Sequence, residues 1–486
     1  MDKSAIVVGA GIGGIATSIR LACKGYKVSV FETARQAGGK LNETHHNGFR
    51  FDMGPSLFTL PNLVTELFEL CDERPEQYFQ YTSLDIICRY FYTDGSSINA
   101  YQDVEKFANE IQQVTGEKKS GVLQFLSRSR ELYELTAPVF IFKSFHKVST
   151  FLSKAFFKAL LHIYKLDTFR TMHNANASWF SDSRVVQLFD RYATYNGSNP
   201  YKAPATLNVI PHLEHSVGAY YPTGGMYRIA QSLLLLAERQ GVTFHFQTPV
   251  TRILTSHHKI VGVEVSDRRY KADVVVSDVD IVSAYKLLGK QIPQRYIKHE
   301  RSSSALIFYW GIDKAFPELE LHNILFSGNY PEEFRCLFNT KTVYSDPTVY
   351  LYISKKKEEN DAPVGCENWF VMINVPENIG QDWDSIVAVS RKQIIQKINT
   401  LLATDIAQHI VFEKMLDPRS IESGTSSFHG SLYGNSSNGR FAAFSRHPNF
   451  KRSIKGLYFA GGSVHPGGGI PLCLASAKII DELIGK

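Results

Sequence analysis

Three glycines near the start of the chain have the spacing of a phosphate-binding turn. Gly9, Gly11 and Gly14 form the pattern G-x-G-x-x-G. The first glycine of such a pattern permits a tight turn, the second lets the backbone approach a pyrophosphate, and the third allows a helix to pack closely on a strand. The free N–H groups and the positive dipole end of that helix face the phosphate. We therefore predict a dinucleotide site here, and a glycine turn that serves packing alone is the alternative.

An acidic residue stands where a ribose would bind. The β-branched run at 5–8 predicts a buried strand before the glycines, a helix is expected over 12–24, and a second strand over 27–31. Glu32 follows that strand, eighteen residues after Gly14. A carboxylate at this point can accept both hydroxyls of an adenosine ribose. The order of strand, helix, strand and acid is typical of a βαβ dinucleotide-binding unit.

Two further motifs indicate which dinucleotide binds. Residues 35–40 read RQAGGK, and residues 48–56 read GFRFDMGPS. Together they resemble the glutathione-reductase-like FAD proteins of the amine oxidase and carotenoid desaturase group, in which a double glycine and its basic neighbours close over the pyrophosphate. The expected cofactor is therefore FAD rather than NAD. The resemblance implies that the cofactor is bound by Arg35, Gly39, Lys40, Gly54, Pro55, Ser56 and Leu57.

A second glycine-rich loop lies near the C-terminus. Residues 461–471 read GGSVHPGGGIP, between an expected strand at 457–460 and an expected helix at 472–484. Pro471 suits the first turn of that helix, where its missing N–H does no harm. The free N–H groups there can stabilise negative charge on the N1/O2 edge of a reduced flavin, which favours hydride acceptance at N5. The alternative is a loop built for packing alone.

This loop resembles the C-terminal signature of bacterial-type phytoene desaturases and their relatives. With the N-terminal motifs, the resemblance covers essentially the whole chain, although only the two ends are specific. It implies further contacts to FAD from Val250 and Asp278 and from Gly461, Gly462, Gly468, Gly469, Ile470, Pro471 and Leu472.

One motif in the middle of the chain bears on the substrate. Residues 221–228 read YPTGGMYR and depart from the Pro-Arg-Gly-Gly form common in phytoene desaturases. They look more like the 3,4-desaturases that act on hydroxylated carotenoids. The resemblance implies an oxidoreductase that moves hydride from a hydroxylated acyclic or monocyclic carotenoid to flavin N5 and introduces a C-3,4 double bond. Quinone or oxygen is the expected final electron acceptor.

Other functions of the same fold stay open at this stage. A phytoene-type desaturase, an amine oxidase and a retinol saturase-like oxidoreductase are the enzyme alternatives. A non-catalytic isoprenoid carrier, similar to the Rab escort proteins, is the alternative outside enzymes. His465 and Arg191 are the candidate catalytic residues, with Tyr195 as a weaker one, and each is alternatively a structural residue. If all three are structural, the base that accepts the substrate proton is solvent water.

Composition narrows the class of protein. The 486 residues are 44% apolar, enough for two or three cores, and the net charge of +6 does not indicate nucleic-acid binding. The six cysteines are scattered, with no pair or histidine at metal spacing, so no metal is expected and the thiols read as reduced. No stretch approaches the roughly twenty apolar residues of a spanning helix. We expect a cytoplasmic protein, peripheral on the inner face of the membrane.

The membrane expectation depends on a run of lysines. Residues 139–166 contain no acidic residue. On one continuous helix, their five lysines would share an arc of about 60°, because a helix turns by roughly 100° per residue. This pattern predicts a basic amphipathic helix in the membrane interface, and a solvated face on an ordinary helix is the alternative. The five are Lys143, Lys147, Lys154, Lys158 and Lys165.

The fold class follows from this order of elements. We predict an α/β protein in which a glutathione-reductase-like, Rossmann-type FAD-binding domain is interleaved with a mixed-sheet substrate domain and a helical, membrane-associated region. The predicted division is 1–73, 216–285 and 421–486 for the FAD-binding segments, 74–215 for the helical region, and 286–420 for the substrate sheet and its helix.

Overall fold

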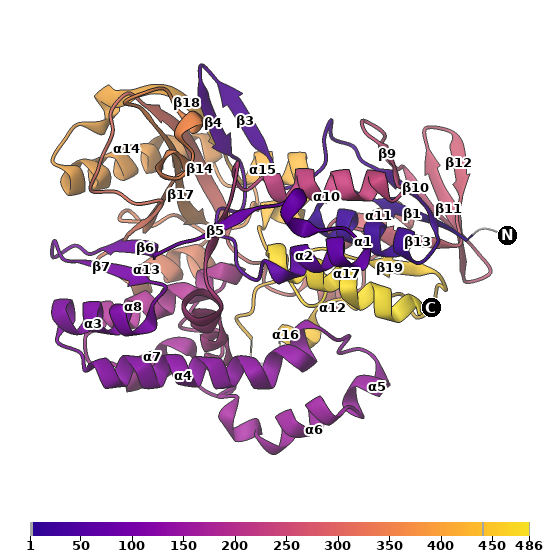
Figure 1. The fold of residues 1–486 in the computed structure, drawn as a ribbon, viewed down its shortest axis with the longest axis horizontal. Helices are drawn as coiled ribbons and strands as arrows, with labels where there is room; N and C mark the ends of the chain where they lie inside the picture. Colours follow the sequence, from indigo (N-terminus) through magenta and orange to yellow (C-terminus); the bar gives the residue numbers. More distant parts are fainter. Residues whose placement is uncertain (1–2, 440–441, 486) are drawn as a thin grey trace.

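A parallel sheet holds the part of the molecule in which both chain ends lie (Figure 1). The computed structural model describes residues 3–439 and 442–485. The sheet has the order β19-β13-β1-β2-β9, and every neighbouring pair is parallel. Its strands come from three distant parts of the sequence: β1 (Ser4–Val8), β2 (Lys27–Phe31), β9 (Thr243–His245), β13 (Val274–Ser277) and β19 (Leu457–Phe459).

Apolar helices cover this sheet. Helix α1 packs against α2, α10 and the C-terminal α17, so the first and last segments of the chain share one core. A Cβ on Gly14 would overlap the carbonyl oxygen of Gly9, which explains why α1 can lie so close to β1 only with glycine there. The helices around the sheet are α1 (Ile12–Cys23), α2 (Asn62–Leu70), α10 (Arg228–Arg239), α11 (Ile281–Leu287), α12 (Gln294–Ile297) and α17 (Ile470–Ile484).

A second, mixed sheet forms the other half of the molecule. Its order is β18-β14-β17-β16-β15-β6-β7, and all neighbours are antiparallel except β15 and β6. The hairpin β6–β7 joins this sheet at one edge, and the other five strands come from residues 304–416. The strands are β6 (Ile86–Phe91), β7 (Ser97–Tyr101), β14 (Ser304–Ile312), β15 (His322–Leu325), β16 (Val349–Ile353), β17 (Glu367–Val375) and β18 (Ile410–Leu416).

The remaining elements connect or flank the two sheets. Outer strands are β3 (Glu43–His46) with β4 (Phe49–Asp52), β5 (Tyr81–Ser83) with β8 (Tyr220–Pro222), and β10 (Arg252–Ser256), β11 (Lys259–Val265) and β12 (Arg268–Lys271). Further helices are α3 (Val104–Thr115), α4 (Lys119–Thr136), α5 (Val148–Phe151), α6 (Lys154–Leu161), α7 (Met172–Trp179), α8 (Ser183–Asp190), α9 (Ile210–His212), α13 (Tyr330–Arg335), α14 (Trp383–Leu402), α15 (Pro418–Thr425) and α16 (Ala442–Ser445). The π turns are Ala137–Ile141, Leu213–Val217 and Cys336–Thr340.

The continuous basic helix predicted over 139–166 is wrong. After the π turn at Ala137–Ile141, the chain forms only α5, α6 and a 3₁₀ turn at Ile163–Lys165. The Oγ of Ser153 accepts a hydrogen bond of 3.2 Å from Phe156 N–H and starts α6 there, which breaks any common helical axis. Lys165 instead pairs with Glu131 on α4. The lysines therefore do not share one stripe.

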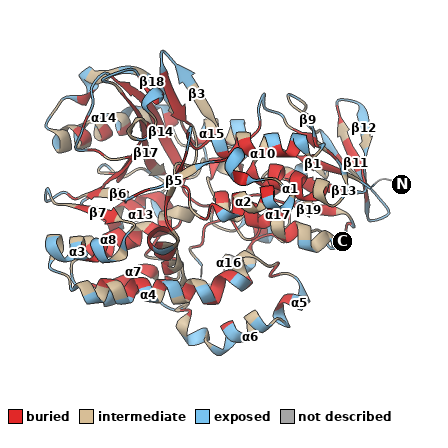
Figure 2. Ribbon diagram, in the orientation of Figure 1, coloured by how far each residue is buried: buried red, intermediate tan, exposed pale blue. Residues whose placement is uncertain are grey.

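Two short helices project from the body of the molecule. In Figure 1, α5 and α6 lie at the lower edge, outside α4, and Figure 2 colours much of α6 as exposed. Leu152, Leu161 and Tyr164 expose 71%, 77% and 74% of their surface, although all three are large and apolar or aromatic. Within the described part of the chain, no helix is both long enough and apolar enough to cross a membrane.

Candidate active site

One cavity of about 1570 Å³ runs between the two sheets, and both glycine-rich motifs line it. Gly11 contributes from the N-terminal turn, and Gly469 contributes from the loop before α17. These residues are separated by nearly the whole chain. The N-terminal and C-terminal glycine-rich motifs therefore line one cavity, as the sequence predicts for a single cofactor site.

Most of the residues predicted to bind the cofactor line this cavity. They are Gly9, Gly11, Glu32, Gly39, Lys40, Gly54, Pro55, Ser56, Leu57, Val250, Asp278, Gly461, Gly462, Gly468, Gly469, Ile470, Pro471 and Leu472. Two predicted residues do not. Gly14 lies behind the wall, where it serves the packing of α1, and the exposed Arg35 is outside the set of lining residues.

Glu32 closes the glycine turn from the end of β2. Its Oε2 accepts 2.6 Å from the backbone N–H of Ala10, and its Oε1 accepts 2.8 Å from the N–H of Ala34. These two bonds hold the carboxylate at the edge of the turn, where it also lines the cavity. The ribose-binding position expected from the sequence is thus occupied by an oriented carboxylate.

The walls of the turn leave no space for side chains. A Cβ on Gly11 would lie 2.5 Å from Asp278 Oδ2, and one on Gly461 would lie 2.6 Å from Asp278 Oδ1. At Gly469, in contrast, a Cβ would meet no atom within 4 Å and would project into open space at the start of α17. This glycine-lined cradle, between the N-termini of α1 and α17, fits an extended dinucleotide whose phosphate and flavin edge need backbone N–H groups.

Asp278 is held between the first and last motifs. Burial raises the pKa of its carboxyl to about 7, although hydrogen bonds from the N–H groups of Gly14 and Gly11 act to lower the pKa. Near neutral pH the Asp278 carboxyl therefore titrates, and its charged and neutral forms are both populated.

Lys40 joins the first cofactor motif to a distant loop. Its Nζ donates 2.7 Å to the carbonyl oxygen of Leu432 and 3.3 Å to that of Ser431. Burial lowers the pKa of Lys40 to about 8, because the interior disfavours the ammonium form. Lys40 therefore lines the cavity while it anchors the loop opposite.

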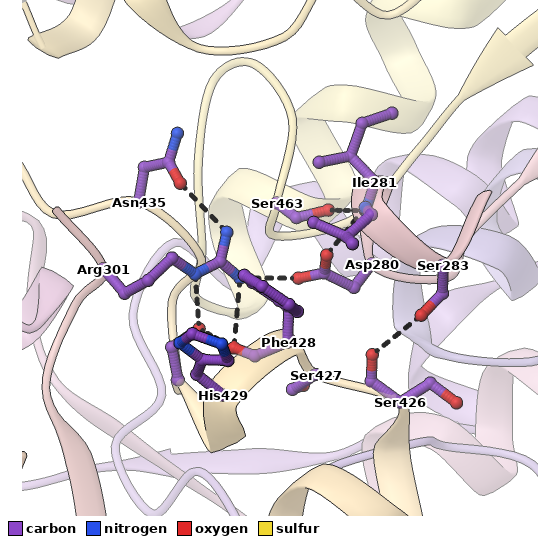
Figure 3. A network of polar contacts seen from close by, with 12 residues as sticks. Asp280, Ile281, Ser283, Arg301, Ser426, Ser427, Phe428, His429, Asn435 and Ser463 are labelled. Atoms are coloured by element: carbon purple, nitrogen blue, oxygen red, sulfur yellow. Dashed lines mark hydrogen bonds and ion pairs between the residues drawn. The ribbon is translucent and has the colours of Figure 1, made fainter. Parts of the chain in front are cut away.

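A buried ion pair connects the cofactor sheet to the substrate sheet. Figure 3 shows the Arg301 guanidinium between the side chains of Asp280 and Asn435, with contacts of 2.8 Å and 2.9 Å. Its Nε also donates 3.1 Å to Ser431 Oγ. On the other side of Asp280, Ser463 Oγ accepts 2.9 Å from the N–H of Ile281. The network therefore fixes both sheets to the C-terminal loop.

His465 does not have the position of a catalytic residue. It is 2% exposed and is not among the residues that line the cavity. Its Nε2 lies 2.8 Å from the carbonyl oxygen of Lys143, and its own carbonyl accepts 2.6 Å from Asn449 Nδ2. Burial lowers the pKa of His465 to about 4. We correct the prediction: the imidazole holds the glycine-rich loop against the segment before α5.

Arg191, the other predicted catalytic residue, does line the cavity. Its Nη1 lies 3.4 Å from Tyr90 Oη and 3.3 Å from Tyr195 Oη, and the guanidinium packs over both rings. Although burial acts to lower its pKa, neighbouring Tyr90, Cys88 and Glu214 raise the pKa above the ordinary value. Arg191 therefore stays protonated and cannot serve as a base.

Much of the cavity wall is apolar. Apolar side chains come both from the helical region and from the substrate sheet, among them Phe140, Phe145, Phe151, Phe156, Leu160, Ile163, Leu166, Ile307, Ile324, Phe370 and Met372. Because these residues come from both sides, the space between them can take a long apolar molecule whose end reaches the glycine-rich cradle.

Sequence reasoning missed several residues of this site. Arg301, Glu214 and His322 are buried, as is the side chain of Asp280, and Asp280, Glu214 and His322 line the cavity. None of them belongs to a local motif. The hydrogen-bond partners of Arg301 lie 21 to 134 residues away along the chain, and that of His322 lies 28 residues away. No short spacing in the sequence therefore indicates these contacts.

Comparison with known proteins places this architecture in a family. Residues 12–479 match the description "Flavin containing amine oxidoreductase". The chain belongs to the flavin-containing amine oxidoreductase family. It is therefore an oxidoreductase with FAD as its cofactor, and the cradle with its two helix N-termini fits this dinucleotide.

Two relatives match over almost the full length of the chain. The 1-hydroxycarotenoid 3,4-desaturase of Flavobacterium sp. (strain P99-3) is 49% identical and covers 99% of both chains. The 4,4'-diaponeurosporene oxygenase of Staphylococcus haemolyticus (strain JCSC1435) is 31% identical and covers 99% of this chain and 97% of its own. A solved oxidoreductase from Methanosarcina mazei shares the fold, with a TM-score of 0.64, 14% identity, and 99% and 100% coverage.

Proposed function

We propose that this flavoprotein introduces a C-3,4 double bond into a hydroxylated acyclic or monocyclic carotenoid. The observation that carries the proposal is the single cavity that joins the glycine-rich cradle to a long apolar space. Full-length similarity to the 1-hydroxycarotenoid 3,4-desaturase supports the choice of substrate. The wall is mostly apolar, with many phenylalanine, leucine and isoleucine side chains, which suits a polyene better than a charged amine.

The reaction removes two hydrogens from neighbouring carbons of the substrate. When bound, FAD supplies the two-electron acceptor that takes one hydrogen as hydride, while the other leaves as a proton and the C–C bond becomes C=C. The protein must therefore hold the C-3,4 bond beside the cradle and keep bulk water away. The apolar wall does both, because it orients the polyene by shape and excludes water from the reacting carbons.

Glu214 is one of three wall carboxyls, with Asp278 and Glu333, whose acid–base properties suit proton acceptance. Burial raises the pKa of the Glu214 carboxyl to about 7, against the lowering effects of Arg191 and of the hydrogen bond from Tyr192. Tyr192 Oη donates 2.7 Å to Oε2, and Tyr195 Oη donates to Oε1. A carboxylate with a pKa near 7 accepts a proton at neutral pH, either directly or through water.

Quinone or oxygen then removes the electrons from the flavoprotein.

The membrane is the source of such a substrate, and we place the protein on the cytoplasmic, inner face of one. The segment 148–169 supports this placement, because it lines the cavity with Phe156 and Leu160 and exposes Leu152 and Leu161 on its surface. Lys154 and Lys158 are exposed on α6 between these apolar residues. Such a surface inserts its leucines between lipid tails and places its ammonium groups at anionic headgroups.

Product analysis in bacteria that make different carotenoids tests the function. Co-expression with a 1-hydroxylated acyclic carotenoid should yield a product with one more conjugated double bond, seen as a red shift in absorption and a loss of two hydrogens in mass. Purified protein should be yellow with flavin and should bleach anaerobically with this substrate. Conversion of phytoene with no change in hydroxylated carotenoids would reject 3,4-desaturation, and a colourless protein that binds isoprenoids would indicate a carrier.

A further inference from the structure

Three polar side chains of the cavity wall are linked to one another and to the cofactor cradle. His322 on β15, Tyr350 on β16 and Ser56 of the cradle all line the cavity. His322 Nδ1 lies 2.8 Å from Tyr350 Oη, which lies 2.7 Å from Ser56 Oγ. The three side chains therefore form a continuous chain of hydrogen bonds from the substrate sheet to the cofactor loop.

His322 has a ring nitrogen that this chain leaves unused. The residue is 3% exposed, and its Nε2 has no hydrogen-bond partner among the described residues. Burial, assisted by the nearby positive charge of Arg191, lowers the pKa of His322 to about 3. The imidazole is therefore neutral, and Nε2 is either a donor or an acceptor, depending on the tautomer.

Arg191 adds a cation to the same wall. It forms no ion pair with any carboxylate in the part of the chain that the structure describes, and the tyrosine contacts of its Nη1 are long, at 3.3 Å and 3.4 Å. A guanidinium has five N–H donors, so most of its hydrogen-bonding capacity is left for a ligand. A hydrogen-bond acceptor that enters this part of the cavity would use the remaining N–H donors of Arg191.

A hydroxyl group matches these two side chains better than other ligands. It accepts from a guanidinium, and it can either donate to or accept from a neutral imidazole, so it suits both tautomers of His322. A pure hydrocarbon end would leave His322 Nε2 buried without a partner and would offer Arg191 no further acceptor, which is unfavourable. An anion would gain from Arg191 but could accept from His322 only in the tautomer with the proton on Nε2, whereas a hydroxyl suits both tautomers.

The position of the pair also fits a hydroxyl at C-1. Three single bonds of about 1.5 Å each separate such an oxygen from C-3, so whatever reads it must lie close to the reacting carbons. Ser56, which belongs to the cofactor loop, is joined to His322 through one tyrosine. Side chains that bind the hydroxyl and are held by this chain of hydrogen bonds therefore lie next to the cradle rather than far from it.

We propose that His322 and Arg191 form a hydroxyl-reading pocket that selects a carotenoid end bearing a tertiary hydroxyl and sets which bond lies beside the cofactor. The proposal rests on the proposed function for the identity of the substrate. It makes His322 and Arg191 positioning and specificity residues, with Tyr350 and Ser56 holding the imidazole in place.

The test compares two non-reactive probes on the FAD-loaded protein. They are a carotenoid that already carries the 3,4 double bond and the C-1 hydroxyl, and the same polyene without the hydroxyl. Changes in polyene absorption give a Kd for each. We expect wild type to prefer the hydroxylated probe by about tenfold or more, as expected when a site built for a hydroxyl rejects the analogue lacking it. In His322→Leu or Arg191→Met, that ratio should fall at least about fivefold.

Two variants control for structural damage. His322→Gln keeps a donor and an acceptor and should retain most of the preference. His212→Leu removes another buried histidine with an unpartnered Nδ1 among the described residues, but His212 does not line the cavity, so the Kd ratio should not change. Far-UV spectra and flavin content confirm that each variant is folded and loaded.

The outcomes separate this proposal from the proposed function. If the probes bind with the expected ratio but no carotenoid is desaturated, the pocket stands and the enzymatic assignment fails. If wild type desaturates hydroxylated carotenoids but both His322→Leu and Arg191→Met keep the wild-type Kd ratio, the pocket is rejected. Equal losses for both probes would likewise reject it, because they would indicate packing rather than recognition.

Discussion

The guanidinium of Arg301 and the carboxylate of Asp280 lie 2.8 Å apart, at the point where the two sheets meet. Asp280 follows the last residue of β13 by three positions, and Arg301 precedes β14 by three. Both side chains are almost fully buried, with 3% and 6% of their surface exposed. The pair therefore determines how the substrate sheet is placed relative to the cradle.

Arg301→Met should destabilise the protein strongly. It leaves Asp280 as a buried carboxylate without its partner, which typically costs about 3–5 kcal/mol. We expect a lower free energy of unfolding in urea and a smaller fraction of bound flavin. Arg391→Met is the matched control, because its pair with Glu413 is about one-third exposed and contributes roughly 0–1 kcal/mol. Equal effects of the two variants would contradict a special role for the buried pair.

The cofactor turn could be predicted from the sequence because its geometry is local. Gly9, Gly11, Gly14 and Glu32 lie within one βαβ unit, where strand, turn and helix fix their relative positions. The resemblance at residues 461–471 then placed the other wall. Arg301 and His322 could not be found in this way, because strand pairing and sheet packing bring their partners from distant parts of the chain.

The lysine run shows how periodicity can mislead. A helical wheel assumes one unbroken axis, and over 139–166 that assumption fails at the π turn and again at Ser153. The exposed apolar residues, rather than the lysines, distinguish this segment in the structure. The residue composition of this segment was informative, whereas the stripe of lysines inferred from the helical wheel was not.

Gly14→Ala should release FAD from a protein that still folds. The new Cβ would overlap the carbonyl oxygen of Gly9, so the N-terminus of α1 must move away from the turn and from the phosphates. We expect flavin content to fall at least about tenfold, because a phosphate contact made by helix N–H groups depends on close approach. The ratio of flavin absorbance to protein absorbance measures this change.

Gly121→Ala is the control for this substitution. Gly121 lies inside α4, and a Cβ there would meet no atom within 4 Å. Alanine should stabilise the helix by about 0.5–1 kcal/mol and leave the flavin content unchanged. Loss of flavin from Gly121→Ala as well would show that the cradle is not the cause.

Glu214→Gln should alter how stability depends on pH. Because burial raises the folded-state pKa from 4.5 to about 7, the stability that protonated Glu214 contributes is complete below pH 4.5 and is lost as pH rises to about 7. The loss in the free energy of unfolding amounts to about 3 kcal/mol, because each tenfold change in proton affinity corresponds to about 1.4 kcal/mol. Glutamine does not titrate, so subtracting its unfolding profile from that of wild type isolates this loss. Parallel profiles would contradict the raised pKa.

Leu152→Ser/Leu161→Ser should weaken binding to lipid vesicles. Each leucine exposes more than 70% of its surface, and burying one in lipid contributes about 1.5–3 kcal/mol, so losing both should reduce the partition coefficient more than tenfold. Sedimentation with vesicles measures it. Val364→Ser is the control, because Val364 is 99% exposed but belongs to the loop before β17.

Lys154→Gln/Lys158→Gln separates charge from apolar insertion on the same surface. Each lysine near an anionic headgroup contributes about 1 kcal/mol, so binding to vesicles rich in anionic lipid should fall roughly thirtyfold. Binding to neutral vesicles should not change, because the leucines remain, and high salt should remove the difference between wild type and variant. Equal binding of both proteins to anionic vesicles at low salt would show that α6 does not face lipid headgroups, and the exposed leucines would then need a different partner.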